Sequence, residues 1–95
     1  MRAIEKKMVQ ALQSKRNFHE SNTCVECDNN NTYVYLFGNC IYKVVNGKAY
    51  FTLAGWNTST TRSRLNALGV GVTQKDWTPY WNGERISLNS WYKVA

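Results

Sequence analysis

The chain has 95 residues, 43% of them hydrophobic, and a net charge of +6 from 12 basic and 6 acidic side chains. This length predicts a single domain over residues 1–95, and four Trp, six Tyr and three Phe can form its core without metal or disulfides. The composition excludes general disorder, and no apolar run approaches the roughly 18 residues of a membrane-spanning helix.

The charge is unevenly distributed along the sequence. Residues 1–16 hold five basic residues and one acid, and residues 17–31 hold three acids. From Asn29 to Lys75 there are five basic residues and no acid. Such a stretch favours an anionic partner, either nucleic acid or an acidic protein surface. The alternative is a solvated basic face that only aids solubility.

Residues 3–15 are predicted to form a helix that packs on a sheet. Their apolar residues recur at the spacing of one helical face, and polar residues occupy the other positions. This stripe consists of Ile4, Met8, Ala11 and Leu12.

Strands separated by turn residues are predicted next, and they indicate an antiparallel sheet of four or more strands. Asn46-Gly47 is a strong two-residue hairpin signal. The predicted strands are Thr23–Asp28, Thr32–Phe37, Cys40–Val45 and Lys48–Leu53.

The Asn46-Gly47 hairpin predicts a register that pairs Val45 with Lys48 and Lys43 with Tyr50. One face is then a core face, formed by Cys40, Tyr42, Val44, Ala49, Phe51 and Leu53. The other face is half apolar and half basic, formed by Ile41, Lys43, Val45, Lys48, Tyr50 and Thr52. We expect either the C-terminal segment or a partner to cover this second face.

A short basic second helix is predicted at about Thr60 to Leu68. Thr58 or Ser59 is its expected N-cap, and Gly69 stands where a left-handed C-cap belongs. Val70–Lys75 alternates as a strand. The Trp-rich tail that follows turns at Asn82-Gly83 and is predicted to form a strand or a lid on the second sheet face.

The segment that begins this helix is the strongest candidate for a binding site. Free N–H groups of a first helical turn, hydroxyl groups and guanidinium groups together can hold a phosphate. Ordinary capping with solvated or paired arginines is the alternative. The predicted phosphate-binding residues are Thr60, Thr61, Arg62 and Arg64, with Lys43 and Lys48 adding attraction.

Exposed aromatics with interleaved lysines permit a second interpretation, base stacking on a sheet. The residues concerned are Tyr33, Tyr35, Tyr42, Lys43, Lys48 and Tyr50. The predicted register places several of them in the core, which favours a structural role.

No catalytic site, metal site or cofactor is predicted. Cys24 and Cys27 form a C-x-x-C with Cys40 and His19 as further candidate zinc ligands, but residues three apart in a strand point to opposite faces. We therefore expect three free cysteines in a reducing compartment, and no secretory leader. With one histidine and few acids, we expect no enzymatic activity and no small-molecule substrate.

The chain resembles a group of short proteins encoded by tailed bacteriophages. The resemblance rests on the opening Met1-Arg2-Ala3-Ile4-Glu5-Lys6, on Tyr35 to Asn39, on a Gly-Trp-x-x-x-Thr-Thr-x-x-Arg-Leu-Asn block ending at Asn66, and on Gln74 to Trp77. It implies a viral gene product acting in the cytoplasm of an infected bacterium. It does not indicate which activity the protein has.

The sequence thus predicts an α+β domain whose order of helix, strands and helix is analogous to that of double-stranded RNA-binding domains. The first hypothesis is a non-enzymatic phage accessory protein that binds nucleic acid through the basic helix N-terminus. The alternative is a stoichiometric inhibitor or modulator of a host protein, such as a defence nuclease, restriction enzyme or polymerase. A third option is a minor virion component, for which self-assembly would be the sign; the oligomeric state stays open.

Overall fold

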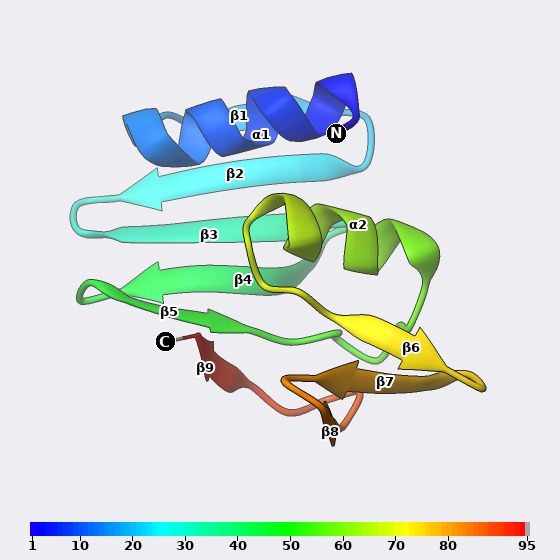
Figure 1. Cartoon of the computed structure of the whole chain (residues 1–95). Helices are drawn as coiled ribbons and strands as arrows, with labels where there is room; N and C mark the ends of the chain where they lie inside the picture. Colours follow the sequence, from blue (N-terminus) through cyan, green and yellow to red (C-terminus); the bar gives the residue numbers. More distant parts are fainter. Residues whose placement is uncertain (95) are drawn as a thin grey trace.

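The computed structural model describes residues 1–94. Its main element is a six-stranded antiparallel sheet, with two helices and a three-stranded sheet packed against it (Figure 1). The predicted α+β class, the N-terminal helix and the short second helix are confirmed. In chain order the elements are α1 (Ala3–Ser14), β1 (Phe18–Glu20), β2 (Thr23–Asp28), β3 (Asn31–Leu36), β4 (Asn39–Val45), β5 (Lys48–Phe51), α2 (Ser59–Ala67), β6 (Thr73–Lys75), β7 (Thr78–Trp81), β8 (Glu84–Arg85) and β9 (Tyr92–Val94).

Helix α1 packs against β2 through its predicted stripe. Met8 and Ala11 are buried in the core, and Val9 and Leu12 pack at its edge. Lys15 takes a left-handed conformation after the last turn, and its backbone N–H reaches the carbonyl groups of the preceding turn. Glu5 is buried as well, although the stripe predicts only apolar burial for this helix.

The large sheet has the strand order β1-β2-β3-β4-β5-β9. The predicted register at Asn46-Gly47 is confirmed, with Val45 opposite Lys48 and Lys43 opposite Tyr50. Both turn residues have positive φ, 53° and 77°, as a two-residue type I′ turn requires. This turn fixes which side chains of β4 and β5 share a face.

A β-bulge corrects the predicted faces at the start of β4. The pairing of β3 with β4 shifts between Val34 and Tyr35, so Cys40 stands opposite Tyr35 and Ile41 turns into the core. Cys40 therefore leaves the predicted core face. Ile41 and Thr52, predicted on the other face, are both buried, with Thr52 N donating to Ile41 O at 2.9 Å.

The predicted C-terminal lid on the second sheet face is wrong. The tail instead forms β7 and β8, which pair with β6 in the small sheet, and then returns as the edge strand β9. Trp81 meets Phe51 edge to face, with ring centroids 5.0 Å apart, and Tyr92 stacks on the same Phe51 at 5.6 Å. Because Phe51 belongs to the core, the tail covers the face that the helices already cover.

The two faces of the large sheet are therefore unlike. The covered face carries the core, with Val25, Val34 and Phe51 among its buried residues. The opposite face, here the open face, lies away from both helices and from β6–β8 (Figure 1). Its side chains, all half-buried or exposed, are His19, Cys24, Glu26, Asp28, Tyr33, Tyr35, Cys40, Lys43, Val45, Lys48, Tyr50 and Lys93.

Candidate nucleic-acid interface

The start of α2 is a well-capped helix end. The Thr58 hydroxyl accepts a hydrogen bond from Thr61 N at 3.1 Å and lies 2.9 Å from the Thr61 hydroxyl. Thr58 is thus the N-cap, as predicted, and Gly69 follows the helix with a φ of +88°. Thr61 is buried, whereas Thr60 is half-buried.

Arg64 lies inside the protein, where it binds a carboxylate. Its side chain is 4% exposed, and Nη1 donates to Glu5 Oε2 at 2.7 Å. Further donations go to Thr23 Oγ1 at 3.0 Å and to Asn22 Oδ1 at 3.3 Å. These partners occupy the fork of donors that a phosphate would need, so the structure removes Arg64 from the predicted phosphate-binding set.

Glu5 is held ionised by this network. Burial by itself raises the pKa of the Glu5 carboxyl, but hydrogen bonds from Ser63, Arg64 and the Arg2 backbone N–H, with the charge of Arg64, lower the pKa below its ordinary value of 4.5. The network joins α1, α2 and β2 at one point, which is a structural role.

Arg62 is half-buried beside the same helix end. Its Nη1 donates to Asn57 Oδ1 at 2.6 Å and to Asn57 O at 3.2 Å. Asn57 in turn donates to the backbone carbonyl of Trp77 at 3.1 Å. Arg62 thus connects the start of α2 to the β6–β7 turn through Asn57. The alternative interpretation of this segment was ordinary capping with paired arginines. It accounts for Thr61, which takes part in the cap, and for Arg64, which is paired with Glu5.

Lys43 and Lys48 are on the open face, whereas α2 lies on the covered face. The six predicted site residues therefore fall into two groups on opposite sides of the sheet. Of the two lysines on the open face, Lys43 has its ammonium group over aromatic rings.

The centre of the open face is a row of alternating aromatic and cationic side chains. Tyr33 pairs with Lys43, Lys43 with Tyr50, and Tyr50 with Lys93, across β3, β4, β5 and β9. Neighbouring strands are about 4.8 Å apart, so the two lysines are about 10 Å apart, and so are the two tyrosines. We call Tyr33, Lys43, Tyr50 and Lys93 the Tyr–Lys row.

Cation–π contacts hold one of these lysines over aromatic rings. Lys43 Nζ lies 4.1 Å from the ring centroid of Trp91 and 5.8 Å from that of Tyr50. An ammonium over a ring face is attracted by the ring quadrupole. The contact brings Trp91, which precedes β9, to the edge of the Tyr–Lys row.

The two ends of the open face differ in charge. Lys43, Lys48 and Lys93 lie on β4, β5 and β9, whereas Glu26 and Asp28 lie on β2. An anion is therefore attracted to the side of the open face formed by β4, β5 and β9 and repelled from the side formed by β2.

The cysteines lie on both faces of the sheet. Cys24 pairs with Tyr35 on the open face and Cys27 pairs with Thr32 on the covered face, so the C-x-x-C points in two directions, as predicted for a strand. Burial raises the pKa of the Cys24 and Cys40 thiols. Within residues 1–94 no group of three or more His, Cys, Asp or Glu is arranged to hold a metal ion.

The sequence predicted part of the aromatic surface on the open face. Tyr33, Tyr35 and Tyr50 were candidates for base stacking, and the structure places all three on the open face, whereas Tyr42 is buried. Trp91 and Lys93 were missed, because only the pairing of β9 with β5 brings them beside Lys43. The alternation of Trp91-Tyr92-Lys93-Val94 was the available strand signal.

No helix in the described part of the chain is long and apolar enough to cross a membrane. No curated protein and no solved structure matches the chain. The family model described as Kyanoviridae Gp96 protein matches residues 1–94, so the chain belongs to this phage protein family. The predicted phage origin is thereby confirmed, whereas the Gly-Trp…Arg-Leu-Asn block as the mark of the family stays a prediction.

Proposed function

We propose that this member of the Kyanoviridae Gp96 family is a small non-enzymatic accessory protein that binds single-stranded nucleic acid on the open face of its sheet, in the cytoplasm of the infected host. The observation that carries the proposal is the Tyr–Lys row. This placement replaces the helix N-terminus as the proposed site, since Arg64 and Thr61 are buried there.

The row fits the chemistry of an unpaired strand. Each base has a flat face that can stack on an aromatic ring, and each phosphate between two nucleotides is attracted electrostatically to a cation. Tyr33 and Tyr50 alternate with Lys43 and Lys93 over neighbouring strands, so rings and charges recur along the same line. A duplex hides the faces of its bases, which is why this surface favours single strands.

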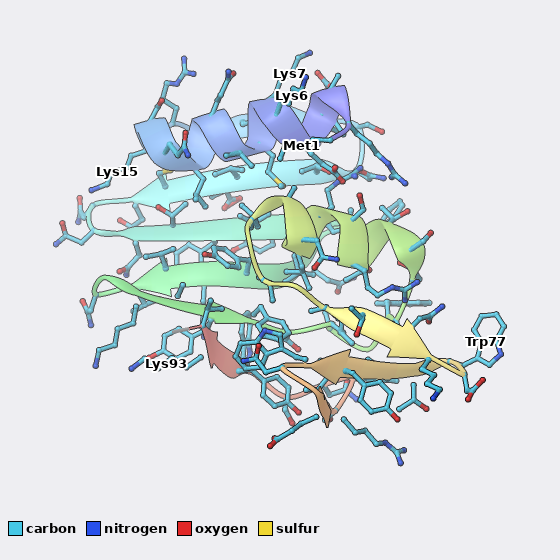
Figure 2. All side chains as sticks on the ribbon, viewed as in Figure 1. Met1, Lys6, Lys7, Lys15, Trp77 and Lys93 are labelled. Carbon is cyan, nitrogen blue, oxygen red and sulfur yellow. The ribbon has the colours of Figure 1, made fainter. Side chains whose placement is uncertain are left out.

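The proposal is tested by the binding of a labelled oligothymidylate in fluorescence anisotropy at several salt concentrations. Lys43→Gln with Lys93→Gln removes two cations from the row, and the slope of log affinity against log salt should fall by about 1.4, at ~0.7 per contact on a single strand. Lys6→Gln with Lys15→Gln is the matched control, since these exposed lysines lie in α1 and directly after it, on the covered side (Figure 2).

The control must retain the slope of the unchanged protein. Equal losses in both double variants would mean that only net charge matters, and absence of binding to single strands would contradict the proposal.

A second candidate function, modulation of a host protein, is favoured by one observation. Trp77 is 86% exposed at the β6–β7 turn and projects from the body of the protein (Figure 2). Tryptophan is enriched among the residues that dominate protein–protein binding. A host protein retained by the protein after nuclease treatment at high salt, and lost in Trp77→Gly, would support this candidate.

A further inference from the structure

We infer that the apolar hollow between Phe37 and Trp56 receives one unpaired base of the strand that lies on the open face. The inference rests on the proposed function and extends the proposed binding surface from the open face to the β3–β4 turn at the end of the sheet. We call this place the rim hollow; it is lined by Leu36, Phe37, Asn39, Ile41, Leu53, Ala54, Trp56, Thr58 and Thr61.

The rim hollow has the size and walls of a ligand site. Its volume is about 430 Å³, within the range of roughly 300–1,000 Å³ that small-molecule sites cover. Its walls are mostly apolar, and Phe37 and Trp56 are 71% and 61% exposed. Two large rings that remain this exposed beside a hollow are available to stack on a flat ligand.

Phe37 has a strained backbone conformation. It is the first residue of a two-residue turn between the paired Leu36 and Asn39, and its φ is +50°. The equivalent position in two other turns is held by Asn46 and Asn82, a residue type that adopts this conformation more easily. Because the Phe37 ring is exposed, core packing does not offset this strain, and strained exposed residues are typical of functional sites.

Phe37 is the residue that the rim hollow shares with the open face. Phe37 also borders a shallow depression that contains Tyr35 and Cys24, both of which belong to the open face. From Lys43 to Asn39 the distance along β4 is about 13 Å, at ~3.3 Å per residue. A strand held at the Tyr–Lys row therefore reaches the rim hollow by following β4.

The polar atoms at the rim fit a base better than an aliphatic side chain. Asn39 contributes an amide, which can pair with the donors and acceptors of a base edge. Every residue lining the hollow is uncharged, so the site does not repel the phosphates on either side of a bound base.

The test compares oligothymidylates of roughly 4 and 12 nucleotides, which span the site sizes of small single-strand-binding folds. Phe37→Asn removes the ring and relaxes the turn, so this variant is expected to fold at least as well as the unchanged protein. Trp56→Ser removes the second ring. Each variant should weaken binding of the longer strand by about 5- to 150-fold, the value of one base–aromatic stack, and leave the shorter strand unaffected.

Other outcomes overturn the inference in distinguishable ways. Unchanged binding of both strands in Phe37→Asn and Trp56→Ser would refute the rim hollow and leave the proposed function standing. No binding of either strand by the unchanged protein would refute both. Concentration-dependent dimerisation in sedimentation that both variants abolish, with strand binding unchanged, would assign the hollow to a second copy of the chain.

Discussion

At the scale of single residues, the contact between Arg64 and Glu5 holds the two helices on β2. Both side chains are at most 4% exposed, and Ser63, Thr23 and Asn22 take up further hydrogen bonds around them. Leaving one charge buried without its partner costs about 3–5 kcal/mol, far more than the pair itself contributes relative to apolar residues.

We therefore predict that Glu5→Gln lowers the free energy of unfolding by about 3 kcal/mol at neutral pH, near the low end of that range because the amide oxygen still accepts from Arg64. Glu5→Leu combined with Arg64→Met should be more stable than Glu5→Leu alone. Urea unfolding measures both. A double variant less stable than the single variant would contradict this and show that Arg64 stabilises the fold through Thr23 and Asn22 even without Glu5.

The same pair predicts a dependence of stability on pH. Because the pKa of Glu5 is lower in the folded chain than in the unfolded chain, its contribution is present above about pH 4.5 and is lost as the pH falls through the lower folded value. Unfolding free energies measured from pH 6 down to pH 3 should fall, and Glu5→Gln should flatten that decline. An equal decline in both proteins would mean that other carboxyl groups cause it.

Trp77 occupies a turn position that normally holds glycine. Asp76 and Trp77 have φ values of 52° and 67°, the pattern of a type I′ turn, whereas the matching second positions of three similar turns are Gly38, Gly47 and Gly83. A residue with a Cβ is strained there by about 1–2 kcal/mol.

Trp77→Gly should accordingly raise the free energy of unfolding by about 1 kcal/mol, the relief of strain less the greater flexibility of glycine in the unfolded chain. Trp77→Ala keeps a Cβ at the same φ and should give no such gain. Urea midpoints at equal slope compare the two. A destabilised Trp77→Gly would show that the exposed ring supports the fold.

At the scale of elements, the start of α2 depends on one cap. Thr58 supplies the hydroxyl that accepts from Thr61 N. Thr58→Ala should lower the free energy of unfolding by about 1 kcal/mol, and Thr58→Ser, which keeps the hydroxyl, should change it little. Thermal unfolding of both variants checks this, and equal loss in both would mean that the Thr58 methyl group, not its hydroxyl, matters.

The elements that the sequence predicted well are those with a local cause. The stripe of Met8 and Ala11 fixes the helix, and Asn46-Gly47 fixes both the hairpin and its register. The bulge that exchanges Cys40 and Ile41 has no such local signal, because it depends on how β4 meets the turn at Phe37. The strand predicted at Val70–Lys75 is present as the shorter β6, whereas β7, β8 and β9 were predicted together as one strand or lid because each has only two to four residues.

The candidate site was harder to predict than the fold. Four hydroxyl residues followed by Arg62 and Arg64 read as an anion site, but the partner that takes Arg64 is Glu5, 59 positions away. The sequence shows no relation between the two. Lys43 and Lys48 were identified correctly as open-face residues because the hairpin register alone places them there.

At the scale of the whole molecule, the fold is one-sided. Both helices and the small sheet lie on one face of the large sheet, and within residues 1–94 no helix or strand covers the other face (Figure 1). That open face has a basic, aromatic side formed by β4, β5 and β9 and an acidic side formed by β2. An antiparallel sheet with a solvent-facing side normally presents polar residues there, so the tyrosines and Trp91 favour the proposed binding on this face.

The most direct test of this account is the mapping of backbone amide shifts by NMR as an oligothymidylate is added to the protein. The account predicts shifts on the open face around Tyr33, Lys43, Tyr50 and Lys93, with little change in α1. Shifts confined to the start of α2, or none at saturating oligonucleotide, would contradict it.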